Sequence, residues 1–541
     1  MARPTRPRPW SRSWSRRPRC SGCKRGFPSG ERSAILRTHV PIVHARGSPM
    51  ASTREKLLGQ FFTPERVAAF LVRWAAPGDG DRVLDPSCGD GVFLRQLHSA
   101  VGVEFCPESA AQARAAAAHA QVVEADFFQW ASTHGPEFDA IVGNPPFIRY
   151  QQFTGPTRKS AFALARRIGV EFNGLTSSWA PFLAVSASLV RPGGRMAFVV
   201  PAEIGHATYA APLIEGLCRN FSSVTIVAIR EKLFPDLSQD AWLLFVSGKG
   251  GRTETIGFTA VDRFCSRIDP DNPTSLVSLR DWRQAGQRLR KFLLPADLRE
   301  AYHLVIERAG ATQLANIADV TIGYVSGDND FFHLSRSAAR LFEIPDAFLR
   351  PTIRRGEQLA TDYVDQRLVD RWLAANEQIY VLDLTSTTEV PRSVAAYLTS
   401  PRGEEARARY KCRVRDPWYV IPGVAQTPSA FITCMSGRES RLAINRAGAV
   451  CTNSVLSVSL MQRVSHRGLL RGWRHPLSRL CQELEGHPLG GGMLKLEPGE
   501  ARRVHVPLRP FHPTKAEGLA LAESIDLMRT WRHYGPDADR A

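Results

Sequence analysis

Two motifs place carboxylates and glycines where apolar, strand-like runs of the sequence end. In LDPSCGDG, Asp85 closes one run, and Gly89 and Gly91 follow in the turn. Glycine lets the backbone turn tightly and approach a ligand closely. Glu104 closes the next run, 19 residues after Asp85, and an acidic side chain at this spacing typically holds the hydroxyl pair of a ribose. Each motif alone also fits an ordinary turn or an exposed carboxylate.

A third run ends at Asp126 and Phe127, which could meet the amino edge and the ring face of an adenine. Three strand ends directed at one nucleoside indicate a binding site more strongly than any one of them. The sequence has no Gly-x4-Gly-Lys-Ser/Thr motif, and no basic residue lies between Asp85 and Arg95. An adenosine ligand without phosphates, such as S-adenosylmethionine, therefore fits better than a nucleoside triphosphate.

Short apolar runs alternate with helical patterns from about residue 62 to 247, which predicts a parallel sheet with helices on both faces. Helices are expected over 63–75, 91–100, 108–120, 178–190 and 211–219. Strands are expected over 82–85, 101–105, 121–126, 138–144, 195–201, 224–229 and 241–247. The predicted fold class of residues 50–247 is therefore α/β, with a Rossmann-like, doubly wound, seven-stranded sheet.

The fourth strand ends in Asn144, Pro145, Pro146 and Phe147. Proline fixes its own φ and cannot donate to a strand ladder, so the strand must stop there. Four stretches resemble, in this order, the motifs of the N6-adenine DNA methyltransferases: LDPSCGDG, VGVEF, EADFF and NPPF. The stretch 62–64 (Phe-Thr-Pro), ahead of the glycine loop and with a large domain after the catalytic unit, is similar to the gamma-class order. The resemblance covers about residues 50–247.

The resemblance implies a role for each motif residue. The Asn144 side-chain oxygen and the Pro145 carbonyl would accept hydrogen bonds from the N6 hydrogens of an adenine flipped out of the duplex. Both prolines, Pro146 included, would hold these acceptors rigid, and Phe147 would stack on the base. Phe234 would supply a second aromatic face, although a buried loop phenylalanine is an equal alternative. No metal is implied. The S-adenosylmethionine site would comprise Phe62, Thr63, Pro64, Asp85, Pro86, Gly89, Gly91, Glu104, Phe105, Asp126 and Phe127.

The second half of the chain lacks this regular alternation. Residues 248–300 are interpreted as a connector, and residues 301–541 as a separate mixed α+β domain for DNA target recognition. Arg and Lys are interleaved with Trp and Tyr, a mixture that suits phosphates and sugars or bases, although a solvated basic face is the alternative. No nuclease carboxylate cluster is evident, so double-stranded DNA is the expected partner and any restriction endonuclease would be a separate protein. The basic stretches are 351–356, 409–419 and 471–480.

Composition limits the class of protein. The 541 residues are 43% hydrophobic and 23% charged, without an apolar run of membrane-spanning length, and the ten cysteines form no disulfide pattern, so a cytoplasmic location is expected. Of the net charge of +18, residues 1–49 contribute 12 Lys/Arg against the single Glu31. This segment fits a disordered basic tail or, as we favour, sequence upstream of a true start at Met50. A zinc finger through Cys20, Cys23, His39 and His44 is a weaker third interpretation.

The sequence therefore predicts a site-specific DNA adenine-N6 methyltransferase of a restriction-modification or related defence system. One alternative is a methyltransferase for an RNA amine or a protein glutamine, which usually lacks a large domain after the catalytic unit. The other is a non-catalytic DNA-binding specificity protein with a relic methyltransferase fold, against which the intact motifs argue. The DNA recognition sequence is not readable, because base contacts depend on the fold of the second half.

Overall fold

The structure is a computed structural model that describes residues 63–235, 240–387, 389–461 and 463–535. Phe62, the start at Met50 and the four residues of the zinc-finger interpretation lie outside the described residues. Residues 51–541 group into one compact unit, so the predicted boundaries at 247 and 301 stay predictions. None of the helices in the described ranges combines the length and apolarity that a bilayer crossing requires.

A nine-stranded sheet occupies the first half of this unit, in the order β3-β2-β1-β4-β5-β7-β6-β8-β9. Strands β1 to β5 pair in parallel, whereas β7 runs antiparallel to both β5 and β6. The strands are β1 Val83–Asp85, β2 Ala100–Glu104, β3 Gln121–Glu124, β4 Phe138–Gly143, β5 Val190–Pro201, β6 Phe221–Ile229, β7 Ala241–Lys249, β8 Thr255–Val261 and β9 Ser275–Ser278.

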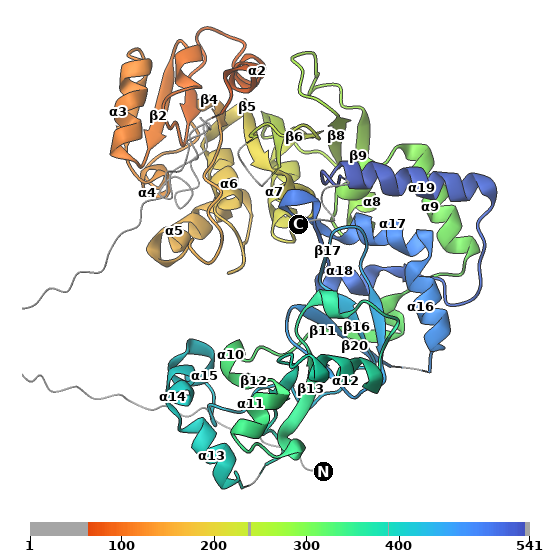
Figure 1. The fold of residues 1–541 in the computed structure, drawn as a ribbon. Helices are drawn as coiled ribbons and strands as arrows, with labels where there is room; N and C mark the ends of the chain where they lie inside the picture. The colour runs from red at the N-terminus through yellow and green to blue at the C-terminus, as the bar shows by residue number, and fades with distance from the viewer. Residues whose placement is uncertain (1–62, 236–239, 388, 462, 536–541) are drawn as a thin grey trace, which may run out of the picture. The chain divides into compact units, whose positions relative to one another are not determined.

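Side chains alternate between the two faces of this sheet, because successive residues of a strand point to opposite sides. Leu84 and Ile141 pack on the face that is covered by α4 to α7, and Val83 and Val142 pack on the face covered by α2 and α3 (Figure 1). The helices are α2 Glu65–Ala75, α3 Pro107–Ala116, α4 Phe127–Ala131, α5 Gly155–Ala165, α6 Trp179–Leu189 and α7 Ala210–Asn220. The α/β class is confirmed.

Two expectations about this region are wrong. The sheet has nine strands rather than seven, because β8 and β9, which lie in the expected connector 248–300, extend it beyond β6. Both are short apolar runs set in Gly- and Asp-rich sequence, which gave a weak strand pattern. The expected helix 91–100 is a single 3-10 turn at Leu94–Gln96, because β2 already begins at Ala100 and leaves no room for a longer helix.

The rest of the chain forms four smaller sheets, with strand orders β11-β20-β16-β18-β14, β12-β15-β13-β19, β17-β22-β21 and β10-β23. Helices pack around them, which agrees with the mixed composition that we predicted. The strands are β10 Thr312–Gln313, β11 Ala318–Ile322, β12 His333–Leu334, β13 Leu349–Ile353, β14 Tyr363–Val364, β15 Tyr380–Leu382, β16 Ala430–Thr433, β17 Met435–Ser436, β18 Leu442–Asn445, β19 Val450–Cys451, β20 Val455–Leu460, β21 His487–Pro488, β22 Leu494–Lys495 and β23 His505–Val506. The helices are α8 Leu279–Gln284, α9 Ala296–Arg308, α10 Asn329–Phe332, α11 Arg336–Leu341, α12 Gln366–Ala374, α13 Arg392–Leu398, α14 Pro401–Ala408, α15 Tyr410–Arg413, α16 His466–Arg474, α17 Pro476–Glu485, α18 Pro498–Arg503 and α19 Lys515–Thr530.

A buried ionic network joins the segment before α9 to α17, α18 and the end of α19. Arg288 donates to the carboxylate of Glu500 and to the backbone carbonyl of Glu485, and all three residues are almost fully buried. Arg532 forms a two-pronged pair with Glu483, at 2.8 Å for both Nε and Nη2. Buried charges are tolerated only when they are paired, so these contacts fix the geometry of this junction.

Candidate active site

The parallel strands β1 to β4 bring their carboxyl ends to one edge of the sheet, and a cavity of about 340 Å³ opens there. In open α/β sheets this edge is where ligands bind. Residues from all three predicted cofactor motifs and from the Asn-Pro-Pro-Phe stretch line this one cavity. They are Pro86, Gly89, Glu104, Phe105, Asp126, Phe127, Asn144 and Pro146.

The glycine turn after β1 needs glycine for two different reasons. Gly89 and Gly91 have φ of +52° and +86°, in the left-handed region that other residues rarely adopt. A Cβ at Gly91 would also lie 3.1 Å from the Cα of Ala113 in α3. The turn can therefore pack against α3 while Gly89 stays open to the cavity, where a side chain would meet nothing within 4 Å.

Glu104, at the end of β2, is buried and binds the glycine turn. Its Oε2 accepts a hydrogen bond from the Gly89 N–H at 2.9 Å, and its Oε1 accepts one from the Cys106 N–H at 2.8 Å. A carboxylate oxygen has a second acceptor site, so Glu104 can hold both backbone groups and still accept from a pair of ligand hydroxyls. These acceptor oxygens fit the hydroxyl pair of an adenosine ribose.

Asp85, the last residue of β1, is fully buried and is not among the lining residues. Its Oδ1 accepts from the Ser87 N–H at 3.1 Å, and no donor in the described part of the chain reaches its Oδ2. Burial raises the pKa of this carboxyl from its ordinary 3.8 to about 8, with smaller contributions from the nearby Glu104 and Asp90 charges. Asp85 therefore supports the turn rather than contacting the cavity.

In the third motif, Asp126 and Phe127 make different contacts. The Asp126 carboxylate caps α4 by accepting from the Gln129 N–H at 2.9 Å. The Phe127 ring stacks on Phe182 of α6, with centroids 4.5 Å apart. In contrast, Phe105 at the cavity is 68% exposed, and an exposed aromatic ring next to a cavity can cover a planar ligand.

The Asn-Pro-Pro-Phe stretch follows directly on β4. The Asn144 Nδ2 donates to the Thr63 hydroxyl at 3.2 Å, so Thr63 contacts the catalytic candidate and does not line the cavity. Pro145 is buried, and Phe147 is half-buried against the core formed with α4 to α7. Pro145 and Phe147 do not line the cavity either. Pro64, Gly91 and Phe234 are also absent from its wall, and Phe234 is buried among the residues that pack with α2.

Sequence reasoning missed part of the cavity wall. The loop after β4, the start of α5 and helix α6 contribute it, and none of them carries a strand-end motif. Six of these residues are Gln152, Phe153, Thr154, Thr157, Ser178 and Phe182. Only their proximity in sequence to Asn144 could have pointed to the first four. None of the described residues lining the cavity is Lys or Arg, which agrees with a ligand without phosphates.

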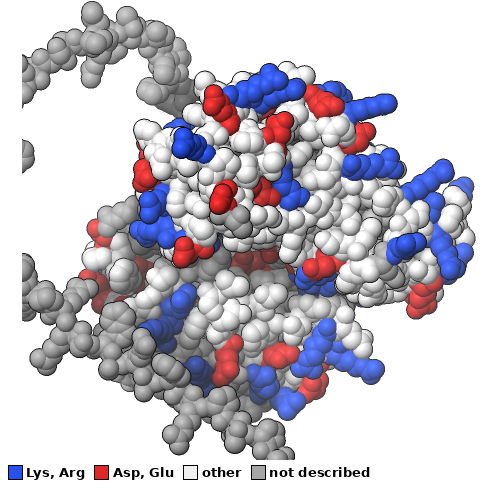
Figure 2. Space-filling view, turned by 90° about the horizontal axis from the view of Figure 1, so that it is seen from below, with Lys and Arg blue, Asp and Glu red and all other residues white. Residues whose placement is uncertain are grey.

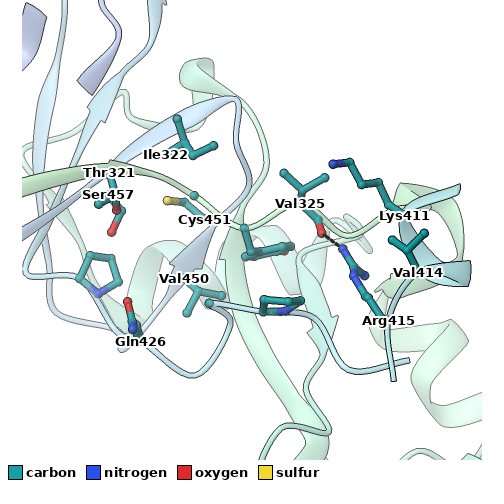
Figure 3. Close-up of a pocket in the computed structure, with 15 residues that line it drawn as sticks. Thr321, Ile322, Val325, Lys411, Val414, Arg415, Gln426, Val450, Cys451 and Ser457 are labelled. Atoms are coloured by element: carbon teal, nitrogen blue, oxygen red, sulfur yellow. Dashed lines mark hydrogen bonds between the residues drawn. The ribbon is translucent and has the colours of Figure 1, made fainter. Parts of the chain in front are cut away.

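The basic stretches of the second half are only partly exposed. Trp473 is 1% exposed and donates to the Ser440 carbonyl, and Arg415 donates to the carbonyls of Val325 and Ser326 beside a cavity of about 410 Å³ (Figure 3). The expectation that Trp473 is available to DNA is wrong, because this side chain is buried in the core. Arg415 is part-buried, and its guanidinium is engaged by two backbone carbonyls. Tyr410, by contrast, is 65% exposed.

Exposed cations remain on the same stretch as Tyr410. They are Arg409, Lys411 and Arg413. Over the face of the molecule that Figure 2 shows, Lys and Arg are interspersed with Asp and Glu rather than gathered into one basic field. On this face, a nucleic-acid contact would therefore depend on local groups of cations.

Two family models match almost consecutive parts of the chain. Residues 48–267 match the N-6 DNA Methylase family, and residues 286–530 match the C-terminal domain of the Type II methyltransferase M.Eco57I. Type II methyltransferase M.XamI of Xanthomonas campestris pv. amaranthicola is 22% identical over 83% of this chain and 85% of its own length. M.AccI of Acinetobacter calcoaceticus is 20% identical over 69% of this chain and 70% of its own length.

A stronger local similarity and two solved structures complete the comparison. M.TthHB8I of Thermus thermophilus is 35% identical, over 28% of this chain and 36% of its own length. The structure of the type IIL restriction-modification enzyme MmeI in complex with DNA covers 86% of this chain and 71% of its own, with 12% identity and a TM-score of 0.49. The match to the structure of the type IIG restriction endonuclease BpuSI covers 88% of this chain and 66% of the BpuSI chain, with 13% identity and a TM-score of 0.41.

Proposed function

We propose that this chain, which belongs with the N6-type DNA methyltransferases of restriction-modification systems, methylates the N6 amine of adenine at a specific sequence in double-stranded DNA. The observation that carries the proposal is the single cavity at the carboxyl edge of the sheet. Its wall joins Glu104 and Asp126, suited to an adenosine, with Asn144 and Pro146 of the Asn-Pro-Pro-Phe stretch. A methyl donor and an amine acceptor can therefore meet at one place.

S-adenosylmethionine is the methyl donor that fits the cavity. Glu104 would hold the ribose hydroxyls, Asp126 would accept from the exocyclic amine, and Phe105 and Phe127 would border the adenine ring, while the turn at Gly89 leaves room for the ligand backbone. When bound, this cofactor supplies a methyl group on a positively charged sulfur. The N6 nitrogen gains that methyl and releases one proton to solvent.

The chain's own contribution is to prepare the amine. The lone pair of adenine N6 is delocalised into the ring, so the amine is planar and a poor nucleophile. Two acceptors, the Asn144 side-chain oxygen and the Pro145 carbonyl, would hold the N6 hydrogens and favour a tetrahedral nitrogen. Acceptors fixed in advance stabilise the transition state without reorganisation. The base must leave the duplex to reach them, at a cost of about a few kcal/mol.

The DNA would be held and read by the second half of the chain, residues 301–541. The group of exposed side chains at 409–413 combines cations for phosphates with the exposed ring of Tyr410. The motif order, with the Thr63 segment ahead of the glycine turn and a large region after the catalytic unit, supports the gamma class.

Methyl transfer from radiolabelled S-adenosylmethionine tests the proposal. Duplex DNA, RNA and a protein release factor are offered separately, and we expect label in DNA at adenine N6. Label in RNA or protein but not in DNA would favour the alternative substrates. Asn144→Ala should lower the turnover number by about 100-fold or more, while calorimetry should still show cofactor binding. Unchanged turnover in this variant would refute the assigned mechanism.

A further inference from the structure

The loop that carries Asn144 to Phe147 is held by hydroxyl groups from two distant segments. The Ser87 hydroxyl, in the glycine turn, donates to the Asn144 carbonyl at 3.1 Å. The Ser178 hydroxyl donates to the Pro146 carbonyl. The carbonyls on both sides of Pro145 are thereby occupied, while no donor in the described ranges reaches the Pro145 carbonyl itself. We call Ser87 and Ser178 the hydroxyl clamp.

Ser178 makes three contacts with this loop. Besides donating to Pro146, its hydroxyl accepts from the Ile148 N–H at 2.9 Å, and its own N–H donates to the Ile148 carbonyl at 3.0 Å. The Ser178 residue is only 2% exposed. Buried backbone groups outside helices and strands must find such partners, and here one residue supplies partners for two residues of the loop.

The sequence explains why this hydroxyl is available. Ser178 immediately precedes α6, the position where a serine normally accepts from an N–H of the first helical turn. The third helical residue, a usual donor, is Pro181, which has no N–H. Ser178 also has helical backbone angles, φ −60° and ψ −34°, instead of the extended backbone of a capping serine. The side chain makes no cap in α6, whereas four serines at the same position elsewhere in the chain all cap their own helix: Ser278, Ser335, Ser400 and Ser465.

We propose that Ser87 and Ser178 are positioning residues, which fix the Pro145 carbonyl as the acceptor for the substrate amine. The inference rests on the proposed function. A carbonyl cannot shift without moving the two peptide groups next to it, and both are held by the clamp. The Pro145 carbonyl lies between two held carbonyls and receives no hydrogen bond from the described residues, so it can accept from the ligand in a fixed direction. Small displacements of such groups cost up to about 100-fold in rate.

The test compares Ser178→Ala with Ser186→Ala. Ser186 lies within α6, is fully buried and donates its hydroxyl hydrogen bond to the Phe182 carbonyl at 2.9 Å, not to the loop. We expect Ser178→Ala to lower kcat for DNA methylation by about 10- to 100-fold, with KM for the cofactor changed less than about twofold. Ser186→Ala should retain wild-type kcat, and both variants should melt at similar temperatures.

A kcat for Ser178→Ala within about twofold of wild type would overturn the proposal. An equal loss in Ser186→Ala, or a raised KM for the cofactor with unchanged kcat, would also overturn it, because these results indicate a general packing role or direct ligand binding. Ser87→Ala removes only the hydrogen bond from the Ser87 hydroxyl to the Asn144 carbonyl. This variant replaces Ser178→Ala in the test if Ser178→Ala does not fold. Its kcat should fall several-fold, and an unchanged kcat would likewise count against the clamp.

Hydrogen exchange separates this inference from the proposed function, because it needs no DNA. The Ile148 amide should exchange at least about tenfold faster in Ser178→Ala than in wild type or Ser186→Ala. If wild-type protein methylates no DNA, the proposed function fails, yet an unchanged Ile148 exchange rate would still refute the clamp. Faster exchange together with the selective loss of kcat supports it.

Discussion

Asp85 gives a sharp prediction, because its carboxyl is buried without full hydrogen bonding. One oxygen accepts from the Ser87 N–H, and the other has no donor among the described residues. Burial raises the pKa of the carboxyl from 3.8 to about 8. We therefore expect the folded protein to hold a proton at Asp85 at neutral pH, whereas the unfolded chain does not.

The sign of the effect follows from proton binding. The folded-state pKa is raised, so between about pH 4 and pH 8 the folded state binds one more proton than the unfolded state at this site, and stability falls as pH rises. The contribution changes by about 1.4 kcal/mol per pH unit. From about pH 5 to about pH 8 the wild-type free energy of unfolding should lose up to roughly 4 kcal/mol because of Asp85.

Asp85→Asn removes this titration and keeps a side-chain oxygen for Ser87. The new amide nitrogen would take the buried place of Oδ2, which makes no hydrogen bond with the described residues, and this adds a penalty of about 1–3 kcal/mol that does not depend on pH. Urea unfolding of both proteins, without cofactor, at several values between about pH 5 and pH 8 measures the difference. The variant should gain stability relative to wild type as pH rises. A difference that is constant, or that shrinks with rising pH, would refute the reasoning.

Two further substitutions, each with a control substitution, test backbone packing and charge pairing. Gly91→Ala should destabilise the protein by about 1–3 kcal/mol, because φ is +86° and the new Cβ would lie 3.1 Å from an α3 backbone atom; Gly80→Ala, with no atom within 4 Å of its Cβ, should have little effect in the same thermal melts. Arg532→Met leaves the buried Glu483 with a weakened ion pair and should cost about 3–5 kcal/mol. Arg502→Met, which removes an exposed pair with an aspartate, should cost less than about 1 kcal/mol. Equal effects of the two arginine substitutions in urea titrations would contradict this assignment.

Local patterns in the sequence predicted the strand ends that meet at the cavity in the first half of the chain. The apolar runs that end at Asp85, Glu104 and Asn144 are strands whose ends meet at one edge, and the predicted resemblance to N6-adenine DNA methyltransferases is confirmed by the family matches. The assignment to the gamma class stays a prediction. Periodicity failed where elements are short: β8 and β9 are embedded in turn-forming sequence, and the 3-10 turn at Leu94–Gln96 has the apolar spacing of a longer helix.

Burial was a second source of error. The Arg and Trp residues of the basic stretches were interpreted as a DNA surface, yet Trp473 packs in the core and Arg415 binds backbone carbonyls. Composition gives the chemical character of a stretch, whereas exposure depends on which face the fold covers.

By itself, the sequence determined which residues stand at the ends of strands, because strand periodicity and proline or glycine breaks are local properties of the chain. Only the tertiary structure decided which side chains surround them. Ser87 lies 57 residues from Asn144, Thr63 lies 81 residues from it, and Ser178 lies 32 residues from Pro146. Contacts at these separations depend on the order of the strands and on how α6 packs against the sheet, and neither leaves a periodic pattern in the sequence. The strand end that carries Asn144 was therefore predictable, and the hydroxyl clamp that holds it was not.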